Sequence, residues 1–268
     1  MSLRHTVESH GWYGLAPWSW NDDSGLLSRP EPLPSGAIAR IEAGQETSHS
    51  IRVTANGLGS GPGDMDAARA MVVRWLSVEW DPGPAVAVAS RVNEAVATAI
   101  DEGHGRFLRG STFYEDFAKT VCTIQIAWSG TRRMVTALVD AIGGGVFPTP
   151  RNVLDAGEAA LRADAGLGFR APQFVAATEM LLQRGLMDEA GRGVEALITR
   201  EELIGLPGIG PYAAGHVAML LHDYSRIPVD SAVSRFFRER YGLAPDRIEP
   251  FFDKWGDYRF LGYRLSAR

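Results

Sequence analysis

Cysteine is almost absent from this chain, which has one, Cys122, in 268 residues. A single cysteine cannot form a disulfide within the chain. It also cannot supply the several thiolates of an iron–sulfur cluster or a four-cysteine zinc site. We therefore expect no iron–sulfur cluster, and we expect a protein of the reducing cytoplasm.

Long apolar runs are missing as well. No stretch of about eighteen apolar residues occurs, so we expect neither a transmembrane helix nor a membrane partner. The first residues, MSLRHTVESHGWYG, lack the apolar core that a secretory signal requires.

The chain has no excess of positive charge, because its formal net charge is -5. This balance argues against a protein that coats nucleic acid through bulk charge, although a local basic face remains compatible with it. The six histidines show no metal-ligand spacing, and we interpret all of them as structural. Neither a phosphate-binding Walker motif nor a dinucleotide glycine motif is present.

Strand patterns appear only near the N-terminus. Residues 35–44 and 49–57 alternate apolar and polar side chains, as half-buried strands do. The glycine-rich stretch 59–64 is predicted to end this strand region. The pattern therefore predicts an α+β fold, with a small N-terminal antiparallel β domain over residues 1–85 and a mostly α-helical body over 86–268.

Helical spacing begins at about Asp64 and continues through the rest of the chain. Thr112, Thr199 and Asp230 precede apolar runs as N-cap residues do, and the two threonines have a glutamate at capping-box spacing. Helices are predicted over 65–80, 111–128, 129–145, 170–185, 198–206, 211–224 and 230–242.

The sequence GLPGIG lies between two of these predicted helices and indicates a helix-hairpin-helix. Gly208 and Gly210 can adopt backbone angles that are closed to other residues. They also leave the N–H groups at the start of the second helix uncovered, so a DNA phosphate can bind there. A plain helix–helix connection with glycine caps is the alternative.

Downstream of the hairpin, the segment IPVDSAVSRF places Asp230 about twenty residues away. The combination LPGIGPYAAGHV … IPVDSAVSRF resembles the helix-hairpin-helix superfamily of DNA glycosylases. The front segment LAPWSW followed by strands is similar to the extra β domain of its 3-methyladenine and 8-oxoguanine branches. The resemblance covers most of the chain and is strongest from about Phe113 onward.

The resemblance implies a base-excision enzyme that acts on a damaged base in double-stranded DNA. Asp230 would be the catalytic carboxylate, stabilising the sugar cation and positioning water; its alternative role is an N-cap. Family members that also cut the backbone have a lysine after the hairpin proline. Here that residue is Tyr212, so the resemblance implies a monofunctional enzyme without lyase activity.

Further site residues follow from the same resemblance. Gln125 falls where the family places its gap-filling residue, and Phe169 with Arg170 matches the supporting wedge. Tyr212, Trp128 and Trp18 are candidates for the base pocket, because aromatic faces bind an electron-poor alkylated base well. The candidate phosphate contacts are Gly208, Gly210, Arg132, Arg133, Arg235 and Arg238. Packing or solvation is the alternative for each of these side chains.

The family hairpin often holds a monovalent cation, K⁺ or Na⁺, through backbone carbonyls. By position these carbonyls belong to Ile204, Leu206 and Ile209. No other cofactor is expected, and we expect a monomer.

An alkylated purine such as 3-methyladenine is the favoured substrate. Excision of another base (8-oxoguanine, uracil, hypoxanthine or adenine) remains open, and so does a non-catalytic DNA-binding role for the hairpin alone.

Overall fold

A computed structural model describes residues 1–57 and 63–266. Its N-terminal part is a four-stranded antiparallel sheet in the order β1-β2-β3-β4, as expected. Most of the stretch 59–64, which was predicted to end the strand region, lies outside the described residues. The strands are β1 (Ser19–Asn21), β2 (Leu26–Pro32), β3 (Ile38–Gln45) and β4 (Ile51–Asn56), and they follow α1 (Leu3–Val7) and the 3₁₀ turn η1 (Gly11–Gly14).

Alternation in β3 sets which face of the sheet is buried. Ala39, Ile41 and Ala43 are fully buried, whereas Arg40 and Glu42 between them point to the other face. β3 pairs with β2 from Leu26↔Gly44 to Pro32↔Ile38, and with β4 from Arg40↔Asn56 to Gln45↔Ile51. The two strands predicted from alternation are thus confirmed, and β1 and β2 are additional.

The remainder of the described chain is helical, which confirms the expected class. Its elements are α2 (Asp64–Trp75), α3 (Gly83–Val92), α4 (Glu94–Asp101), α5 (Phe113–Val121), α6 (Trp128–Ala137), η2 (Leu138–Ile142), α7 (Pro150–Ala163), η3 (Gly168–Arg170), α8 (Ala171–Gln183), η4 (Glu195–Leu197), α9 (Arg200–Ile204), α10 (Pro211–Leu220), α11 (Ser231–Tyr241), η5 (Pro245–Arg247), α12 (Ile248–Phe251), η6 (Asp253–Tyr258) and α13 (Arg259–Ser266). The expected boundary at residue 85 falls inside α3.

One predicted helix is shorter than expected. The pattern favoured a helix over 111–128, but α5 ends at Val121 and the chain turns through residues 122–127 before α6 begins. Thr112 does cap α5, since its hydroxyl accepts the Glu115 N–H at 3.1 Å. The early end matters because it creates an exposed loop between two packed helices.

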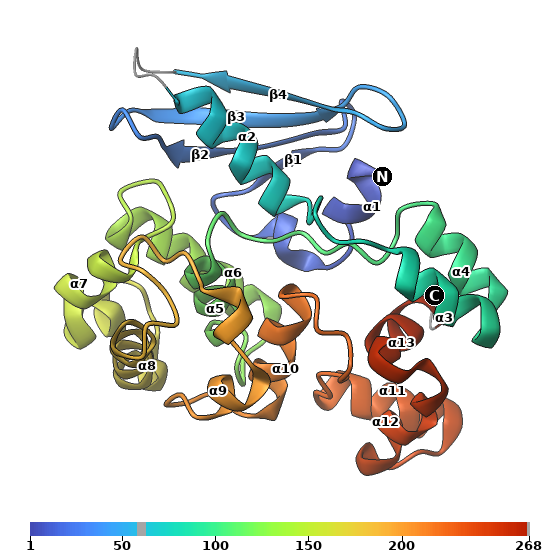
Figure 1. Ribbon diagram of the computed structural model, residues 1–268. Coiled ribbons are helices and arrows are strands. Elements are labelled where there is room, and N and C mark those ends of the chain that lie inside the picture. The colour runs from blue at the N-terminus through green and yellow to red at the C-terminus, as the bar shows by residue number, and fades with distance from the viewer. Residues whose placement is uncertain (58–62, 267–268) are drawn as a thin grey trace.

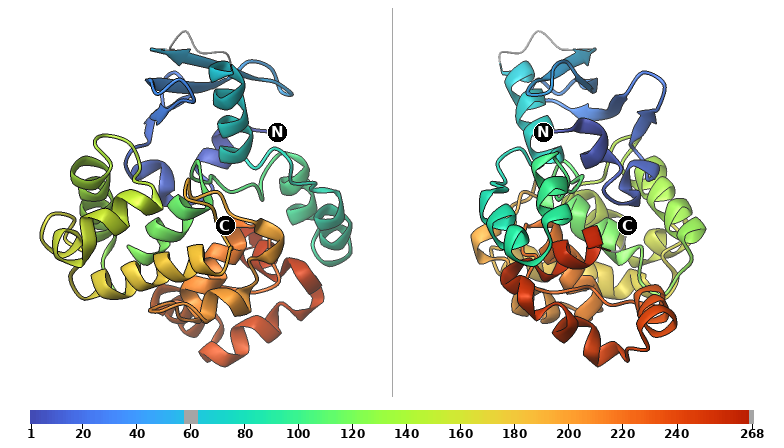
Figure 2. Two further views of the ribbon diagram at one scale, coloured as in Figure 1. Left: turned by 60° about the vertical axis from the view of Figure 1, so that its left-hand side comes forward. Right: turned by 90° about the vertical axis from the view of Figure 1, so that its right-hand side faces the viewer.

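The sheet lies at one end of the molecule, and α2 runs from it toward the helical body (Figure 1). In the first view α7 and α8 occupy one side and α3, α4 and α11–α13 the other. α5, α6, α9 and α10 lie between them, and the views in Figure 2 agree with this arrangement. In the described residues, no helix is both long and apolar enough to cross a membrane.

A buried network of charges ties the sheet to the helical body. Arg29 of β2 donates to both carboxylate oxygens of Glu115 on α5, at 2.7 and 2.9 Å. Lys119, one turn further along α5, donates to the same carboxylate at 2.6 Å. Although burial alone would raise the pKa of Glu115, the Arg29 and Lys119 cations lower it to about 2.

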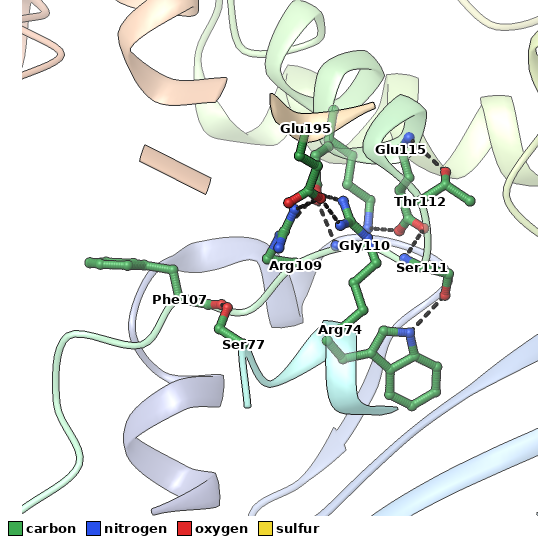
Figure 3. Close-up of polar contacts among 12 residues, drawn as sticks. Arg74, Ser77, Phe107, Arg109, Gly110, Ser111, Thr112, Glu115 and Glu195 are labelled. Atoms are coloured by element: carbon green, nitrogen blue, oxygen red, sulfur yellow. Dashed lines mark hydrogen bonds and ion pairs between the residues drawn. The ribbon is translucent and has the colours of Figure 1, made fainter. Parts of the chain in front are cut away.

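A second part of this network surrounds Asp116. Arg74 of α2 donates to the Asp116 carboxylate at 2.7 Å, and the backbone N–H of Gly110 donates to it at 2.6 Å. Arg74 and Arg109 both reach Glu195 (Figure 3). Side chains from the sheet, α2, α5 and η4 therefore form a set of ion pairs that is buried at Glu115 and Asp116 and reaches the surface at Glu195.

Candidate active site

The hairpin is a tight turn between α9 and α10. The Thr199 hydroxyl caps α9 by accepting the Glu202 N–H, and buried Leu206 and Ile209 anchor the turn in the core. Gly208 has φ +76, and a Cβ there would lie 2.6 Å from Oε1 of Gln173 on α8. Gly208 therefore needs to be glycine both for its backbone angle and for its contact with α8.

Gly210 differs from the sequence prediction in one respect. Its backbone is extended, at φ -94 and ψ 179, which any residue can adopt. A Cβ at Gly210 would meet no atom within 4 Å, and no side chain caps the first N–H groups of α10. The exposed glycine thus leaves the N-terminus of a ten-residue helix open to an anion.

Asp230 is half-buried and caps α11. Its Oδ1 accepts the Val233 N–H at 2.7 Å, which confirms the predicted N-cap. The chain reaches Asp230 past Gly215 of α10, where an added Cβ would lie 3.5 Å from Cβ of Pro228. This close approach holds the segment that carries Asp230 against α10.

Four rings from opposite ends of the sequence gather beside α10, and we call them the aromatic cluster: His10, Trp12, Tyr212 and His216. The His216 ring centroid lies 5.8 Å from Trp12 and 6.1 Å from both His10 and Tyr212. Residues of η1 therefore meet residues of α10, about 200 positions later. Sequence analysis assigned both histidines a purely structural role and did not single out Trp12.

Two rings of the cluster, Tyr212 and His216, lie within electrostatic range of the Asp230 carboxylate. Burial lowers the pKa of His216 to about 4, and the Asp230 charge opposes this shift. Burial raises the pKa of Tyr212, a hydrogen bond with the Thr123 side chain lowers it, and Asp230 raises it. Burial likewise raises the pKa of Tyr263 on α13, and Asp230 adds to the shift. Asp230 thus lies within electrostatic range of three aromatic side chains.

The two histidines of the aromatic cluster have different hydrogen-bonding environments. His10 Nε2 lies 2.9 Å from the Leu108 carbonyl, and His10 Nδ1 accepts the Trp12 N–H at 3.3 Å. Nε2 of His216 is buried without a hydrogen-bond partner among the described residues. An uncharged imidazole with an open nitrogen can pair with the edge of a heterocycle.

The α5–α6 loop presents Gln125, which is exposed and has a left-handed backbone at φ +49. Arg170 is buried behind it and donates through Nε to the Ile124 carbonyl at 3.0 Å and through Nη2 to the Gln125 carbonyl at 3.3 Å. Arg170 thus supports this loop from within. Its neighbour Phe169 is 55% exposed.

The other predicted site residues are distributed as follows. Trp128 is exposed at the start of α6, and its indole lies on Gly11, where a Cβ would be 2.9 Å from Cζ2. Trp18 is buried in the core, edge-on to Trp75 and with Arg29 over its ring, so it does not offer an open face. Arg132, Arg133, Arg235 and Arg238 are all exposed.

Phe169 and the hairpin lie close together. A small cavity of about 20 Å³ is lined by Ile124, Phe169 and Arg170 on one side and by Pro207, Gly208 and Ile209 on the other. The α5–α6 loop, η3 and the hairpin therefore form one continuous surface.

Comparison with known proteins shows that the chain shares its fold with several solved structures. No protein-family model and no curated protein sequence matches the chain. Among solved structures, the 3-methyladenine DNA glycosylase of Archaeoglobus fulgidus has a TM-score of 0.72 at 19% identity, covering 100% of this chain and 94% of that one.

Two further structures share this fold. The Clostridium acetobutylicum 8-oxoguanine glycosylase/lyase bound to double-stranded DNA has a TM-score of 0.67 at 16% identity, covering 100% of this chain and 92% of its own. The Schizosaccharomyces pombe 3-methyladenine DNA glycosylase bound to abasic DNA has a TM-score of 0.52 at 18% identity, covering 68% of this chain and 94% of its own.

Proposed function

We propose that this chain is a monofunctional DNA glycosylase that removes an alkylated purine such as 3-methyladenine from double-stranded DNA. The observation that carries the proposal is the convergence of Asp230, the aromatic cluster and an uncapped hairpin helix in one place. The shared fold supports it, since the similar structures include 3-methyladenine and 8-oxoguanine glycosylases.

Asp230 is the proposed catalytic carboxylate. A base alkylated at N3 carries a positive charge, and it leaves as a neutral molecule when it takes the electrons of the glycosidic bond. The positive charge then resides on the deoxyribose, where a fixed carboxylate stabilises it. Water attacks C1′ and gives up a proton to the carboxylate or to solvent. The products are the free base and an abasic site.

The aromatic cluster is the proposed base pocket. Tyr212 offers a ring that a cationic purine binds well, and the buried Trp12 packs behind it in the cluster. His216 stays uncharged at neutral pH, because burial lowers its pKa to about 4, so it does not repel a cationic base. Its open Nε2 provides one polar contact to the base edge.

The proposal that lyase activity is absent rests on the positions of the side-chain amines. Tyr212 occupies the place after the hairpin proline, and a phenol cannot form an imine with the sugar. The chain has two lysines, Lys119 and Lys254. Lys119 is fully buried and bonded to Glu115, and Lys254 lies in η6.

DNA phosphates are proposed to bind the uncapped N-terminus of α10. The contributing residues are Gly208, Gly210 and the exposed arginines Arg132, Arg133 and Arg235.

A monovalent cation bound by the carbonyls of Ile204, Leu206 and Ile209 belongs to this proposal. The Leu206 carbonyl accepts the Ile209 N–H at 3.2 Å and keeps a second lone pair for an ion. Such a cation would offset repulsion between phosphate and the acidic protein.

Excision assays on single-lesion duplexes test the proposal. We expect release of 3-methyladenine, alkali-labile abasic sites, and no covalent adduct after borohydride treatment. Release of 8-oxoguanine alone would favour the second candidate, which the similarity to the 8-oxoguanine glycosylase/lyase fold supports. Binding without release of any base would reduce the protein to a DNA-binding module, and a trapped adduct would refute the monofunctional assignment.

A further inference from the structure

A cavity separate from the candidate active site lies between the sheet and the helical body. Its volume is about 540 Å³, which is in the range of small-molecule sites. Its walls come from the end of β2, from α2, from the start of α5, and from residues 147–149, Ala190 and Arg192. The described residues that line it include neither Asp230 nor any member of the aromatic cluster. The proposed reaction therefore does not account for this cavity.

Most of the wall surface of the cavity is apolar. Ala67, Ala70 and Met71 line it from one face of α2, because residues three and four positions apart lie on the same side of a helix. Phe147 lines it as well, and the Lys119 ammonium lies 5.5 Å from the Phe147 ring centroid. A molecule that fills the cavity therefore needs an apolar body.

Glu31 of β2 contributes a carboxylate oxygen that the protein leaves open. Its side chain is only 5% exposed and lines the cavity. Oε1 accepts the Ser111 hydroxyl and lies 2.6 Å from Nε of Arg29. The Ser111 oxygen is itself occupied, since it accepts the Trp75 Nε1–H at 2.7 Å (Figure 3). No hydrogen bond from the described residues reaches Oε2 of Glu31. Because buried polar atoms are normally paired, Oε2 is an acceptor for a group that enters the cavity.

The cations that line the cavity are already paired. Arg29 and Arg74 bind carboxylates of the buried charge network, and Arg192 donates to Asp188 at 2.8 Å. Burial raises the pKa of Glu31, although the Arg29 cation opposes this shift. A further cation beside Oε2 would favour the ionised carboxylate. The group that completes this site is therefore a donor with a positive charge and not an anion.

We propose that this cavity binds a small organic cation, an amine or amidine with an apolar body. The N–H groups of the ligand donate to Oε2 of Glu31, and its apolar body packs against Met71 and Phe147. A hydrogen bond between an ammonium or amidinium group and a carboxylate is about twice as strong as one between neutral groups. This inference is independent of the proposed function, because the site uses none of the residues assigned to base excision.

Calorimetric titration with benzamidine and benzoate tests the inference. The two probes share a phenyl ring, but benzamidine is a cation with N–H donors, whereas benzoate is an anion that only accepts. We expect benzamidine to bind the full chain and benzoate to bind at least about tenfold more weakly, since a hydrogen bond to a charged group has that effect. Equal affinity for the two probes, or no binding of benzamidine at millimolar concentration, would overturn the inference.

Two variants locate the bound probe. Glu31→Gln keeps the size of the side chain and an acceptor for Ser111 but removes the charge, so benzamidine should bind at least about tenfold more weakly. Ala70→Phe keeps Glu31 and adds a ring at the cavity wall, and it should weaken binding as well. Ala95→Phe is the matched control, because Ala95 is an exposed alanine of α4 that does not line the cavity. Wild-type affinity in a folded Glu31→Gln variant, or in Ala70→Phe if the first does not fold, would overturn the inference.

A competition experiment distinguishes the cavity from the aromatic cluster, since benzamidine is also an aromatic cation. We expect Asp230→Asn to bind benzamidine as the wild type does. Saturating benzamidine should not displace a duplex that carries a tetrahydrofuran abasic analogue. Displacement of the duplex, or loss of benzamidine binding in Asp230→Asn, would place the probe at the aromatic cluster and overturn the inference while leaving the proposed function intact. Benzamidine binding that depends on Glu31, without excision of any lesion, would do the reverse.

Discussion

The Asp230 carboxylate accepts the Val233 N–H at 2.7 Å, so the proposed catalytic group is also the N-cap of α11. The two roles can be separated by substitution. Asparagine caps a helix about as well as aspartate, whereas alanine costs about 1 kcal/mol. We expect Asp230→Asn to fold with nearly wild-type stability and to lose at least about 100-fold in single-turnover excision, as removal of a charge-stabilising group does.

The comparison with Asp230→Ala completes this test. The alanine variant should lose the same activity and, in addition, about 1 kcal/mol of unfolding free energy in urea. Wild-type excision by Asp230→Asn would show that the residue is a cap alone.

Gly11 and Trp128 give a second prediction. Alanine at residue 11 places a Cβ 2.9 Å from the indole, so Trp128 must move. We expect Gly11→Ala to weaken binding of the abasic duplex about 3- to 10-fold, since stacking on a base is worth about 1–3 kcal/mol. Gly14→Ala in the same turn is the control, because no atom lies within 4 Å of its Cβ position. Equal binding by the two variants would argue against any contact between Trp128 and the DNA.

Substitution of Glu115 is expected to have a large effect on the free energy of unfolding. Its carboxylate neutralises Arg29 and Lys119, and all three are buried. Glu115→Gln leaves Lys119 without its ion pair and Arg29 with Glu31 alone, and we expect a loss of about 3–5 kcal/mol in urea denaturation. The exposed pair Arg162–Glu158 provides the control, since Glu158→Gln should cost less than about 0.5 kcal/mol. Similar losses of unfolding free energy in the two variants would show that the buried ion pairs of Glu115 stabilise the fold no more than an exposed pair does.

The lowered pKa of His216 leads us to expect that the stability of the protein depends on pH. Its pKa in the folded protein is lowered from the ordinary 6.5 to about 4 by burial. The unfolded chain therefore takes up a proton first, so stability is lost as pH falls from about 6.5 to 4. We expect His216→Phe to have a shallower decline of melting temperature over this range, with His49→Phe, a change in an exposed loop, as the control. An unchanged slope in His216→Phe would contradict the buried, uncharged state.

The sequence predicted correctly those elements in which the local pattern of apolar and polar residues matches the pattern of burial. Alternation in 35–44 gave β3, and threonine caps gave the starts of α5 and α9. It missed β2 because Arg29, Glu31 and two prolines do not look like a buried strand. Arg29 and Glu31 pair with each other, and the further partner of Arg29, Glu115, lies 86 residues later in α5. It also extended α5 too far, since the apolar spacing continues through Ile124 and Ile126.

In the candidate site, too, residues that lie close in sequence were predicted, and residues that only the tertiary fold brings together were missed. Asp230, Tyr212 and the hairpin were found because they lie within one short stretch of sequence. His10 and Trp12 were not, because only the tertiary fold brings η1 against α10. Arg170 was expected to belong to the supporting wedge; it lies buried behind the loop that carries Gln125, and its part in DNA binding stays a prediction.

The Arg29–Glu115–Lys119 ion pairs also constrain how the chain can be divided. The sheet holds one buried charge of the set and the helical body holds the other two. A fragment that ends near residue 85 would keep the Arg29–Glu31 pair but lose Glu115, and the remaining fragment would keep Glu115 and Lys119 without Arg29. We therefore expect each fragment to be less stable alone than within the full chain, because the cut divides a buried set of charges.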